Sequence, residues 1–425
     1  MKRENILSDG FLNQSAIQAV RQPLTLIPKC GACGLYKHCQ SPKMPVSGQG
    51  KRRILLLGET GGRNEDRENR QFVGASGQEL EKSLAKFGIN MRLDCWLTNA
   101  VICRPHDAEG NNRTPTPKEI EWCRPTVVKT IKELKPDVII PLGGTAVKSL
   151  LGWLWKEDVG NISRWDGWRI PCQKINSWIC PTWHPASLLH DGSRNGEDQR
   201  GARENEVRRL LFEKHLKRAS KLKGKPWPDG PPNYASMVEV VWDDARAAKA
   251  IGEFAEAGKV CAFDYENSPL KPYVESRRIV CCSISDGDRT ISYPWTGKAI
   301  KATKRFLESD VPKVCSNVKH ELLWSFKVFG VWVKNVAFDT MIAAHVLDNR
   351  EGITSIKFQA FMNLGQESWD DHIKPWLKSK KGGENDHNRI HELDLGKLCQ
   401  YCGLDSLMEI LVAKIQAKQI GWDLD

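Results

Sequence analysis

The sequence lacks two features that would place the protein in or across a membrane. It has no run of about 20 apolar residues, the length that a bilayer-spanning helix needs. Its polar start, residues 1–5, is followed by no apolar signal core. These absences predict a protein of a reducing cytoplasm with no membrane partner, and structural disulfides are rare in that compartment. Its 14 cysteines are therefore candidates for metal ligands or for core residues.

Four cysteines in the first third of the chain form a close pair and two distant single thiols: Cys30, Cys33, Cys103 and Cys123. A Cys-x2-Cys pair followed by further cysteines is typical of a metal or iron–sulfur site. Zinc and an iron–sulfur cluster both accept four thiolates, so the residues alone leave both open. Cysteines in apolar, strand-like segments are instead predicted to be small core residues, for example Cys261, Cys281 and Cys282.

The positive charge is concentrated in the first half of the chain. Residues 1–233 contain 38 Lys and Arg against 25 Asp and Glu, a net charge of +13. Residues 234–425 contain 25 against 27, a net charge of −2. Residues 226–232 are rich in proline and cannot continue a helix or lie inside a sheet. We therefore predict domains over residues 1–220 and 234–425, a linker over residues 221–233, and a basic first domain suited to a phosphate backbone.

In the first domain, short apolar runs are each followed at once by small or polar residues. Helical stretches lie between these runs, over residues 77–87, 117–134 and 145–151. The alternation predicts a three-layer α/β/α arrangement with a parallel sheet and helices on both faces. Ligands of such sheets bind at the carboxyl ends of the strands. Polar motifs that follow the runs, among them those at Gly58, Asn99 and His184, are therefore expected to meet at one site.

The order and spacing of the motifs resemble the family 4 uracil-DNA glycosylases, the iron–sulfur type, across about residues 25–220. The matching segments are residues 58–66 (GETGGRNED), 71–77 (QFVGASG), 98–105 (TNAVICRP), 114–120 (TPTPKEI) and 184–187 (HPAS). The usual first motif of the family is Gly-Glu-Ala-Pro-Gly, and this chain has Thr60 and Gly61 in place of the alanine and the proline. The resemblance implies a uracil-DNA glycosylase-like fold and the excision of uracil from DNA.

The same resemblance assigns roles to individual residues. It implies that a [4Fe-4S] cluster is held by Cys30, Cys33, Cys103 and Cys123. It implies a uracil-binding set made of Gly58, Thr60, Phe72, Asn99 and His184. The Asn99 amide offers a donor and an acceptor that complement the edge of a flipped uracil, whereas cytosine presents the reverse pattern. By resemblance, Phe72 stacks on the base and His184 stabilises the uracilate that leaves. The loop that contains Glu59, residues 58–62, places the attacking water.

The second domain opens with carboxylates on a predicted strand. Asp264 and Glu266 follow the apolar residues 259–263 and, being two apart, face the same side, where they can converge on a hard cation. Later motifs are residues 317–321 (NVKHE), 338–345 (FDTMIAAH) and 401–405 (YCGLD). Tyr401 and Asp405 are four apart and share one helical face. Together these segments resemble the 3′-to-5′ proofreading exonuclease domain of family A DNA polymerases, the type with a tyrosine in its third motif, over about residues 235–420.

This second resemblance implies a ribonuclease H-like mixed sheet and a centre of two Mg²⁺ or Mn²⁺ ions. The ions would be held by Asp264, Glu266, Glu321 and Asp405. They would activate a water, which Tyr401 orients, and stabilise the leaving 3′ oxygen. Glu321 stands in place of the family's aspartate and keeps the charge on a longer side chain. Bound cations would also allow a net-negative domain to act on a polyanion.

The leading hypothesis is a bifunctional enzyme of DNA repair and replication, a uracil-DNA glycosylase and 3′-to-5′ exodeoxyribonuclease acting on single-stranded or uracil-containing DNA. This pairing is typical of a phage replication component in a bacterial cytoplasm or an infected host cell. No polymerase motif is present, so a separate DNA polymerase chain is an expected partner.

Three alternatives stay open. In the first, the altered 58–62 loop makes the first domain a uracil- or DNA-binding module that tethers the exonuclease to a polymerase. The others are a glycosylase for another modified base, since one amide reads only part of a base edge, and an exonuclease made inactive by Glu321.

Overall fold

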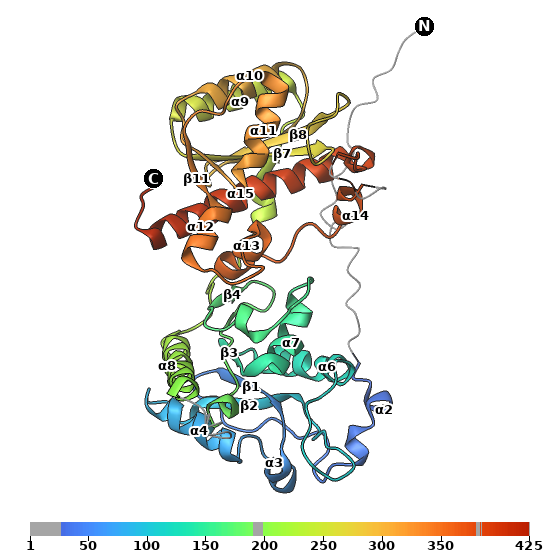
Figure 1. Ribbon diagram of the computed structural model, residues 1–425, viewed down its shortest axis with the longest axis vertical. Helices are drawn as coiled ribbons and strands as arrows, with labels where there is room; N and C mark the ends of the chain where they lie inside the picture. Colours follow the sequence, from blue (N-terminus) through green and yellow to red (C-terminus); the bar gives the residue numbers. More distant parts are fainter. Residues whose placement is uncertain (1–26, 190–198, 380–382, 384, 425) are drawn as a thin grey trace.

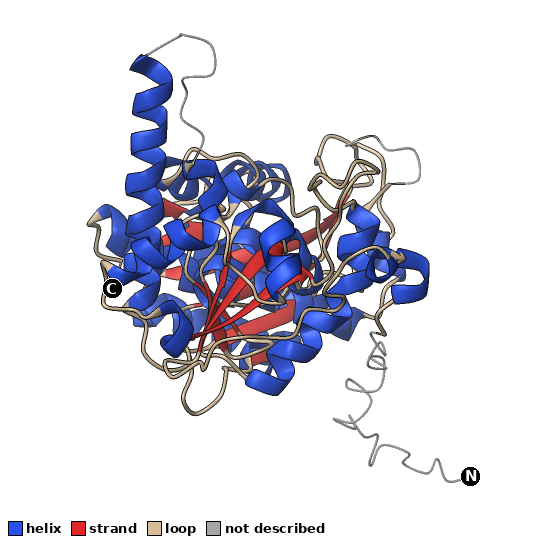
Figure 2. Cartoon of the chain, turned by 90° about the horizontal axis from the view of Figure 1, so that it is seen from below, coloured by secondary structure: helices blue, strands red, loops and turns tan. Residues whose placement is uncertain are grey.

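Two β-sheets, each with its own helices, occupy the two halves of the chain (Figure 1). The computed structural model describes residues 27–189, 199–379, 383 and 385–424, so the polar start at residues 1–5 lies outside the described residues. Figure 2 shows the strands enclosed by helices. Both halves are therefore mixed α/β structures, as the sequence predicts.

The first sheet has five strands in the order β2-β1-β3-β5-β4. Its strands are β1 (Ile54–Thr60), β2 (Cys95–Val101), β3 (Val138–Pro141), β4 (Ile170–Cys172) and β5 (Ser177–Ile179). All neighbouring strands pair in parallel except β4, which pairs antiparallel with β5. The predicted parallel sheet is confirmed, with an antiparallel edge strand added. Strand β2 continues to Val101, so Asn99 lies inside a strand rather than after one.

Helices cover both faces of this sheet and enclose two apolar clusters. They are α2 (Cys30–Cys33), α3 (Arg63–Glu68), α4 (Ala75–Ala85), α5 (Met91–Asp94), α6 (Pro117–Leu134), α7 (Gly143–Leu154) and α8 (Gln199–Ser220), with short 3-10 helices η1 (Leu35–Lys37), η2 (Ile162–Arg164) and η3 (Pro185–Leu188). Helix α6 has the predicted bounds because Thr116 and Glu119 form a capping box and Pro117 fits the first helical position.

The second sheet has six strands in the order β11-β10-β7-β8-β9-β6. Its strands are β6 (Val238–Val240), β7 (Cys261–Ser268), β8 (Arg278–Ser285), β9 (Thr290–Pro294), β10 (Lys313–Cys315) and β11 (Val336–Asp339). The strands β7, β8 and β9 are antiparallel, whereas β10 runs parallel to β7 and β11, and β6 runs parallel to β9. The predicted mixed sheet is therefore confirmed.

Helices also cover both faces of the second sheet. They are α9 (Asp244–Ala257), α10 (Gly297–Glu308), α11 (Val318–Phe329), α12 (Thr340–Leu347), α13 (Ile356–Leu364), α14 (Lys374–Leu377) and α15 (Leu395–Ile420), with η5 (Tyr234–Met237) and η6 (Ile390–Glu392). Phe263 and Tyr265 of β7 pack into the cluster under α9, α10 and α11. The alternation along the strand therefore directs Asp264 and Glu266 toward α15 on the other face.

The two halves are packed against each other through α13 and β4, which lie at the junction in Figure 1. The side chain of Gln173, just after β4, donates to the carbonyl of Leu364 at 3.1 Å. Residues 221–233, predicted as a linker, contain no helix or strand in the described structure. Trp227 within this segment is nevertheless fixed to Asn176 by two hydrogen bonds, of 2.7 and 3.2 Å. No helix among the described residues is long and apolar enough to cross a membrane.

Candidate functional site

Gly58, Phe72 and Asn99 converge at the carboxyl ends of strands β1 and β2. A Cβ atom at Gly58 would lie 2.4 Å from the amide of Asn99 and 2.7 Å from the Phe72 ring. Both distances are too short for a real side chain, so the site needs glycine at this position. Phe72 is 7% and Asn99 is 3% exposed, so an aromatic face and an amide meet in a sheltered place.

The backbone of Phe72 is held in a left-handed conformation with φ of 55°. The Arg92 guanidinium donates to the Phe72 carbonyl at 2.7 Å. On the other side, Glu65 Oε1 accepts from the backbone N–H groups of Val73 at 3.0 Å and Gly74 at 2.7 Å. A left-handed aromatic residue is strained, and such strain persists where the surroundings fix it. Arg92 and Glu65 therefore position the Phe72 ring.

The backbone orients the Asn99 amide. With the amide oriented so that both of its groups are paired, its nitrogen donates to the Thr98 carbonyl and its oxygen accepts from the Gly61 N–H, each at 3.3 Å. A proline at position 61, as in the usual family motif, would have no N–H to donate. The departure from that motif therefore supplies a hydrogen bond to Asn99.

His184 follows strand β5 after residues 180–183 and caps η3. Its Nδ1 accepts from the Ala186 N–H at 3.2 Å, so the neutral ring carries its proton on Nε2. Burial lowers the pKa of His184 to about 4. A Cβ at Gly143 would lie 2.8 Å from the Cβ of His184, which shows how closely α7 packs against this histidine. At neutral pH, His184 is therefore an uncharged donor.

Glu59 and Thr60 end strand β1 and are half-buried. Burial raises the pKa of the Glu59 carboxyl, and a hydrogen bond from Thr145 opposes that rise. A carboxylate with a raised pKa is a stronger base than an exposed one. Glu59 therefore has the chemistry that activating a water requires.

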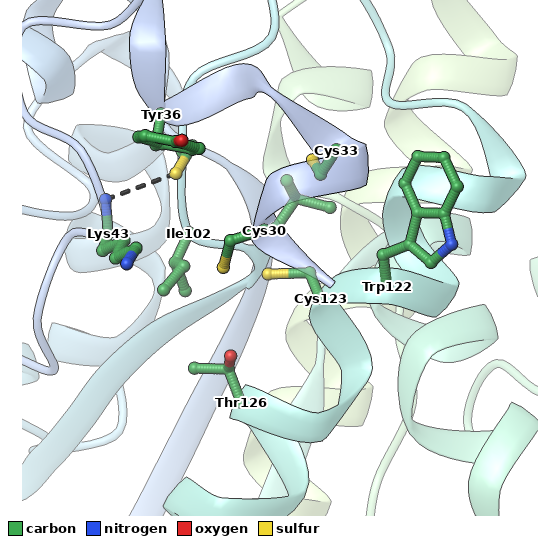
Figure 3. A pocket seen from close by; sticks show the side chains of 10 residues that line it. Cys30, Cys33, Tyr36, Lys43, Ile102, Trp122, Cys123 and Thr126 are labelled. Carbon is green, nitrogen blue, oxygen red and sulfur yellow. Dashed lines mark hydrogen bonds between the residues drawn. The ribbon is translucent and has the colours of Figure 1, made fainter. Parts of the chain in front are cut away.

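The four predicted cysteine ligands line one small cavity with Tyr36, Lys43 and Thr126. Cys30 and Cys33 come from α2, Cys123 from α6, and Cys103 lies just after β2. Figure 3 shows the side chains of Cys30 and Cys123 pointing toward each other. The Lys43 N–H donates to the Cys103 sulfur at 3.3 Å. Cys39, a fifth thiol, packs against the small apolar cluster of side chains that contains Cys103.

The four thiols form a donor set that zinc and an iron–sulfur cluster both accept. Burial also raises the pKa of Cys103 to about 12 and that of Cys123 to about 11. A positively charged iron centre would hold such buried thiols in the ligating thiolate form.

The predicted carboxylates of the second domain meet between β7 and α15. One oxygen each of Asp264 and Glu266 and the sulfur of Cys402 lie within 4.8 Å of one another. Burial, together with the nearby Asp405, raises the pKa of Asp264 to about 8. A cation bound between these groups would lower their pKa values and hold them in the carboxylate form.

Tyr401 and Asp405 project from one face of α15, as the sequence predicts. Both are buried, at 6% exposed each. Lys357 of α13 pairs with Asp405 and lies 3.0 Å from the Tyr401 hydroxyl. The indole N–H of Trp369 donates to the same Asp405 oxygen at 3.0 Å. No sequence motif pointed to Lys357 or Trp369.

Glu321 of α11 lies near Asp264, whose charge adds to burial in raising the pKa of Glu321. Glu409, one turn after Asp405 on α15, is a fifth buried carboxylate, and its helical spacing from Asp405 could have identified it. Among the described residues, neither Glu321 Oε2 nor Glu409 Oε2 has a hydrogen-bond partner. Orphaned buried oxygens of this kind suit cation binding. Asp339, by contrast, accepts backbone hydrogen bonds at the starts of α11 and α12.

Comparison with known proteins decides the family of the first half. The uracil DNA glycosylase superfamily model matches residues 45–208. The chain is 36% identical over 179 residues to a type-4 uracil-DNA glycosylase of Pyrobaculum aerophilum, covering 41% of this chain and 87% of that protein. It is 33% identical over 198 residues to the Thermotoga maritima type-4 enzyme, covering 44% and 86%. The chain belongs to the type-4 uracil-DNA glycosylase family. Its first half is the glycosylase domain.

The second half matches a 3′-5′ exonuclease family model over residues 238–418. The chain is also 34% identical over 112 residues to the DNA polymerase of Bacillus phage SP01, covering 26% of this chain and 12% of that protein. Escherichia coli RNase D, an exoribonuclease, aligns over 44% of this chain and 46% of its own length at 16% identity, with a TM-score of 0.33. The family model identifies this half as a 3′-5′ exonuclease domain.

Proposed function

We propose that this chain excises uracil from DNA with its glycosylase domain and removes nucleotides from DNA 3′ ends with its exonuclease domain. The observation that carries the proposal is the convergence of two predicted side-chain sets. Phe72 and Asn99 meet beside Gly58, and Asp264 and Glu266 meet beneath α15. The domain boundary at residues 221–233 stays a prediction.

Base recognition rests on Asn99 and Phe72. The Asn99 amide offers one donor and one acceptor to the edge of a flipped uracil, and the Phe72 ring offers a face for stacking. The missing side chain at Gly58 leaves room between the two. A uracil that stacks on Phe72 and pairs with Asn99 along one edge is distinguished from cytosine, because cytosine presents the reverse pattern of donors and acceptors.

Bond cleavage rests on His184 and Glu59. When the bond between the sugar carbon and the base nitrogen breaks, its electron pair moves onto the uracil ring. The Nε2–H of neutral His184 donates to the carbonyl oxygen where this charge collects. Water then bonds to the sugar carbon and gives its proton to Glu59, whose raised pKa makes it a suitable base.

The four cysteines support a structural [4Fe-4S] cluster. Cys103 lies four residues after Asn99 and two residues after the end of β2, so the cluster would fix the end of the strand that reads the base. When bound, the cluster supplies positive charge and a rigid crosslink between α2, α6 and β2. We assign it no step in the chemistry of base excision.

The exonuclease set supports hydrolysis of the terminal phosphodiester. Two Mg²⁺ or Mn²⁺ ions would be held by Asp264, Glu266, Glu321 and Asp405. These ions supply an activated water and stabilise the leaving 3′ oxygen. The Tyr401 phenol lies beside Asp405 on α15 and orients the water. DNA is the shared substrate of the two domains, and a separate polymerase chain as a further partner stays a prediction.

One assay tests both activities. A 5′-labelled oligonucleotide with a single uracil is incubated with the full chain, in EDTA or in Mg²⁺. The proposal expects an alkali-labile break only at the uracil in EDTA, and a ladder shortened from the 3′ end in Mg²⁺. Binding to the uracil strand without any break would instead support the tethering module, in which the Thr60–Gly61 loop has lost turnover. A break at another base would redirect the assignment of the glycosylase substrate.

A further inference from the structure

The exonuclease centre contains a lysine that no motif assigns. Lys357 pairs with Asp405, and its ammonium lies 3.0 Å from the Tyr401 hydroxyl. The ammonium also lies over two rings, 4.8 Å from the centre of Tyr401 and 4.7 Å from that of Trp369. The lysine side chain is only 13% exposed. Four separate contacts to three residues fix the position of a buried cation inside the centre.

The charges of the centre explain why a cation is present there. Five carboxylates gather among the described residues of the site: Asp264, which is half-buried, and Glu266, Glu321, Asp405 and Glu409, which are buried. Lys357 pairs with Asp405, so its ammonium offsets part of this negative charge.

We propose that Lys357 is a positioning residue of the exonuclease, which holds Tyr401 and Asp405 in place for the attack and is itself held in place by the glycosylase domain. This inference rests on the proposed exonuclease function. The ammonium fixes the phenol that orients the water and one oxygen of a metal ligand. Its own position depends on helix α13.

Helix α13 has two opposite faces with different partners. Ile356 and Ala360 pack with Tyr401 in the cluster on α15. Phe358 and Phe361 instead enter the apolar core of the glycosylase domain. There, Phe361 lies 5.2 Å from Trp155 and Phe358 lies 5.3 Å from Trp165, measured between ring centres. The helix that carries Lys357 is therefore built into both domains.

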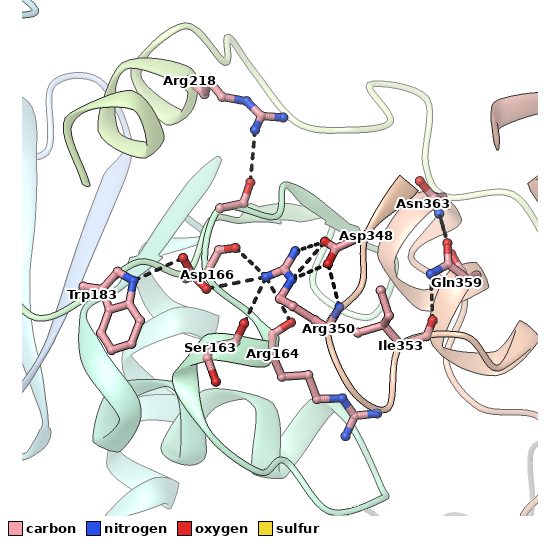
Figure 4. A network of polar contacts seen from close by, with 11 residues as sticks. Ser163, Arg164, Asp166, Trp183, Arg218, Asp348, Arg350, Ile353, Gln359 and Asn363 are labelled. Carbon is pink, nitrogen blue, oxygen red and sulfur yellow. Dashed lines mark hydrogen bonds and ion pairs between the residues drawn. The ribbon is translucent and has the colours of Figure 1, made fainter. Parts of the chain in front are cut away.

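A polar clamp fixes the segment just before α13 (Figure 4). Arg350 donates to the carbonyl groups of Ser163 at 3.1 Å and Asp166 at 2.9 Å. In the opposite direction, the Arg164 guanidinium donates to the Gly352 carbonyl at 2.5 Å. The start of α13 is thus anchored to the glycosylase domain by hydrogen bonds that each domain donates to the other.

The end of α13 makes an equally close contact. Gly365 caps the helix with φ of 64°, and a Cβ at this position would lie 1.5 Å from the Pro171 carbonyl oxygen of β4. Gly258 caps α9 with the same φ of 64°, but nothing lies within 4 Å of a Cβ there. A side chain at Gly365 would push the domains apart, whereas one at Gly258 would meet only solvent. The two glycines form a matched pair for a test.

The first test replaces Lys357 in the full chain. The variants are Lys357→Met and Lys357→Arg, and the control is Lys418→Met on the exposed side of α15. The measurements are kcat and KM in Mg²⁺, Mn²⁺ affinity by calorimetry, and Tm. Lys357→Met is expected to lower kcat about 100-fold and to keep KM within about threefold of wild type. Losses of this size are typical when a donor that stabilises developing charge is removed. The Mn²⁺ affinity of this variant should fall, because Asp405, a proposed metal ligand, loses the contact that holds it in place. Lys357→Arg should recover at least about tenfold in kcat.

The outcomes of this test separate the inference from the function on which it rests. An unchanged kcat or an unchanged Mn²⁺ affinity for Lys357→Met in an active protein would overturn the positioning role alone. A wild-type chain that degrades no 3′ ends would overturn the proposed exonuclease function, and this inference with it.

The second test uses the glycine pair. Gly365→Ala should lower the exonuclease kcat at least about tenfold relative to Gly258→Ala, since both carry the same backbone strain and only the first separates the domains. Uracil excision by Gly365→Ala should stay within about threefold of wild type. Equal exonuclease activity in the two variants would overturn the claim that docking to the glycosylase domain holds Lys357.

Discussion

Arg350 of the exonuclease domain donates a hydrogen bond to the backbone carbonyl of Asp166 in the glycosylase domain, at 2.9 Å. The carboxylate of the same aspartate accepts from the indole N–H of Trp183 at 3.2 Å. Trp183 immediately precedes His184. A single aspartate thus connects the domain interface to the loop that carries His184.

Replacing Arg350 should lower the folding stability of the chain. Arg350→Met leaves the carbonyl groups of Ser163 and Asp166 without their donor and should lower the free energy of unfolding by about 1–3 kcal/mol. Urea denaturation measures the change. The control is Arg305→Met, since Arg305 is exposed on α10. Equal stability of the two variants would contradict a structural role for the clamp.

Asn99 should govern uracil excision without affecting the exonuclease. Asn99→Ala removes both hydrogen-bonding groups from the base pocket and should slow single-turnover excision by about 10²- to 10³-fold. Degradation of 3′ ends in Mg²⁺ should stay at the wild-type rate. Asp264→Ala should give the opposite pattern, with excision kept and 3′ degradation lost. A loss of both activities in either variant would indicate misfolding rather than separate sites.

The pH dependence of excision should show no step near the usual titration of histidine. Because burial lowers the pKa of His184 to about 4, its ring is neutral throughout the physiological range. The single-turnover rate should therefore show no change assignable to His184 between about pH 5.5 and 8. Below its pKa, Nδ1 would gain a proton and lose its bond from Ala186. A step near pH 6.5 that disappears in His184→Asn would contradict this prediction.

The cysteine assignment is tested by chemical analysis. Cys123→Ser removes one of the four thiols that line the cavity and should reduce both iron and acid-labile sulfide in anaerobically purified protein. Cys172→Ser changes a fully buried cysteine on β4, far from that cavity in the fold, and should leave both contents unchanged. Wild-type protein that contains zinc, with neither iron nor sulfide, would return the zinc alternative.

Glu321 should be needed for cation binding despite its extra methylene. Glu321→Gln keeps the shape of the side chain but removes the charge, and should weaken Mn²⁺ binding by about tenfold, or about 1.4 kcal/mol. The 3′ degradation rate should fall with it. If Glu321→Gln matches wild type in both measurements, the second-motif glutamate is not a ligand. If wild type itself is inactive and Glu321→Asp is active, the glutamate inactivates the domain.

Much of the fold could be predicted because its signals are local. Helix α6 was placed at its bounds by Thr116, Pro117 and Glu119, which lie within four residues of one another. Asp264 and Glu266 share a face because strand periodicity requires it. The antiparallel pairing of β4 could not be predicted, since its three residues carry no pattern that distinguishes direction.

The rest of the site depends on contacts between residues distant in sequence. Lys357 and Trp369 lie 48 and 36 residues from Asp405, in segments without any motif. Arg92, which holds Phe72, is likewise an ordinary surface-type residue in the sequence. Only packing reveals these partners, and packing across the domain junction cannot be derived from either family pattern.

Strand β4 is the outer edge of the glycosylase sheet, and the end of α13 lies over it. The backbone N–H of Gln173 donates to the Gly365 carbonyl at 3.4 Å, and the Gln173 side chain reaches Leu364. An uncovered edge strand offers its free backbone groups to other chains and promotes aggregation. The exonuclease domain thus covers this edge of the glycosylase sheet. A fragment that ends near residue 220 would expose this edge and tend to precipitate.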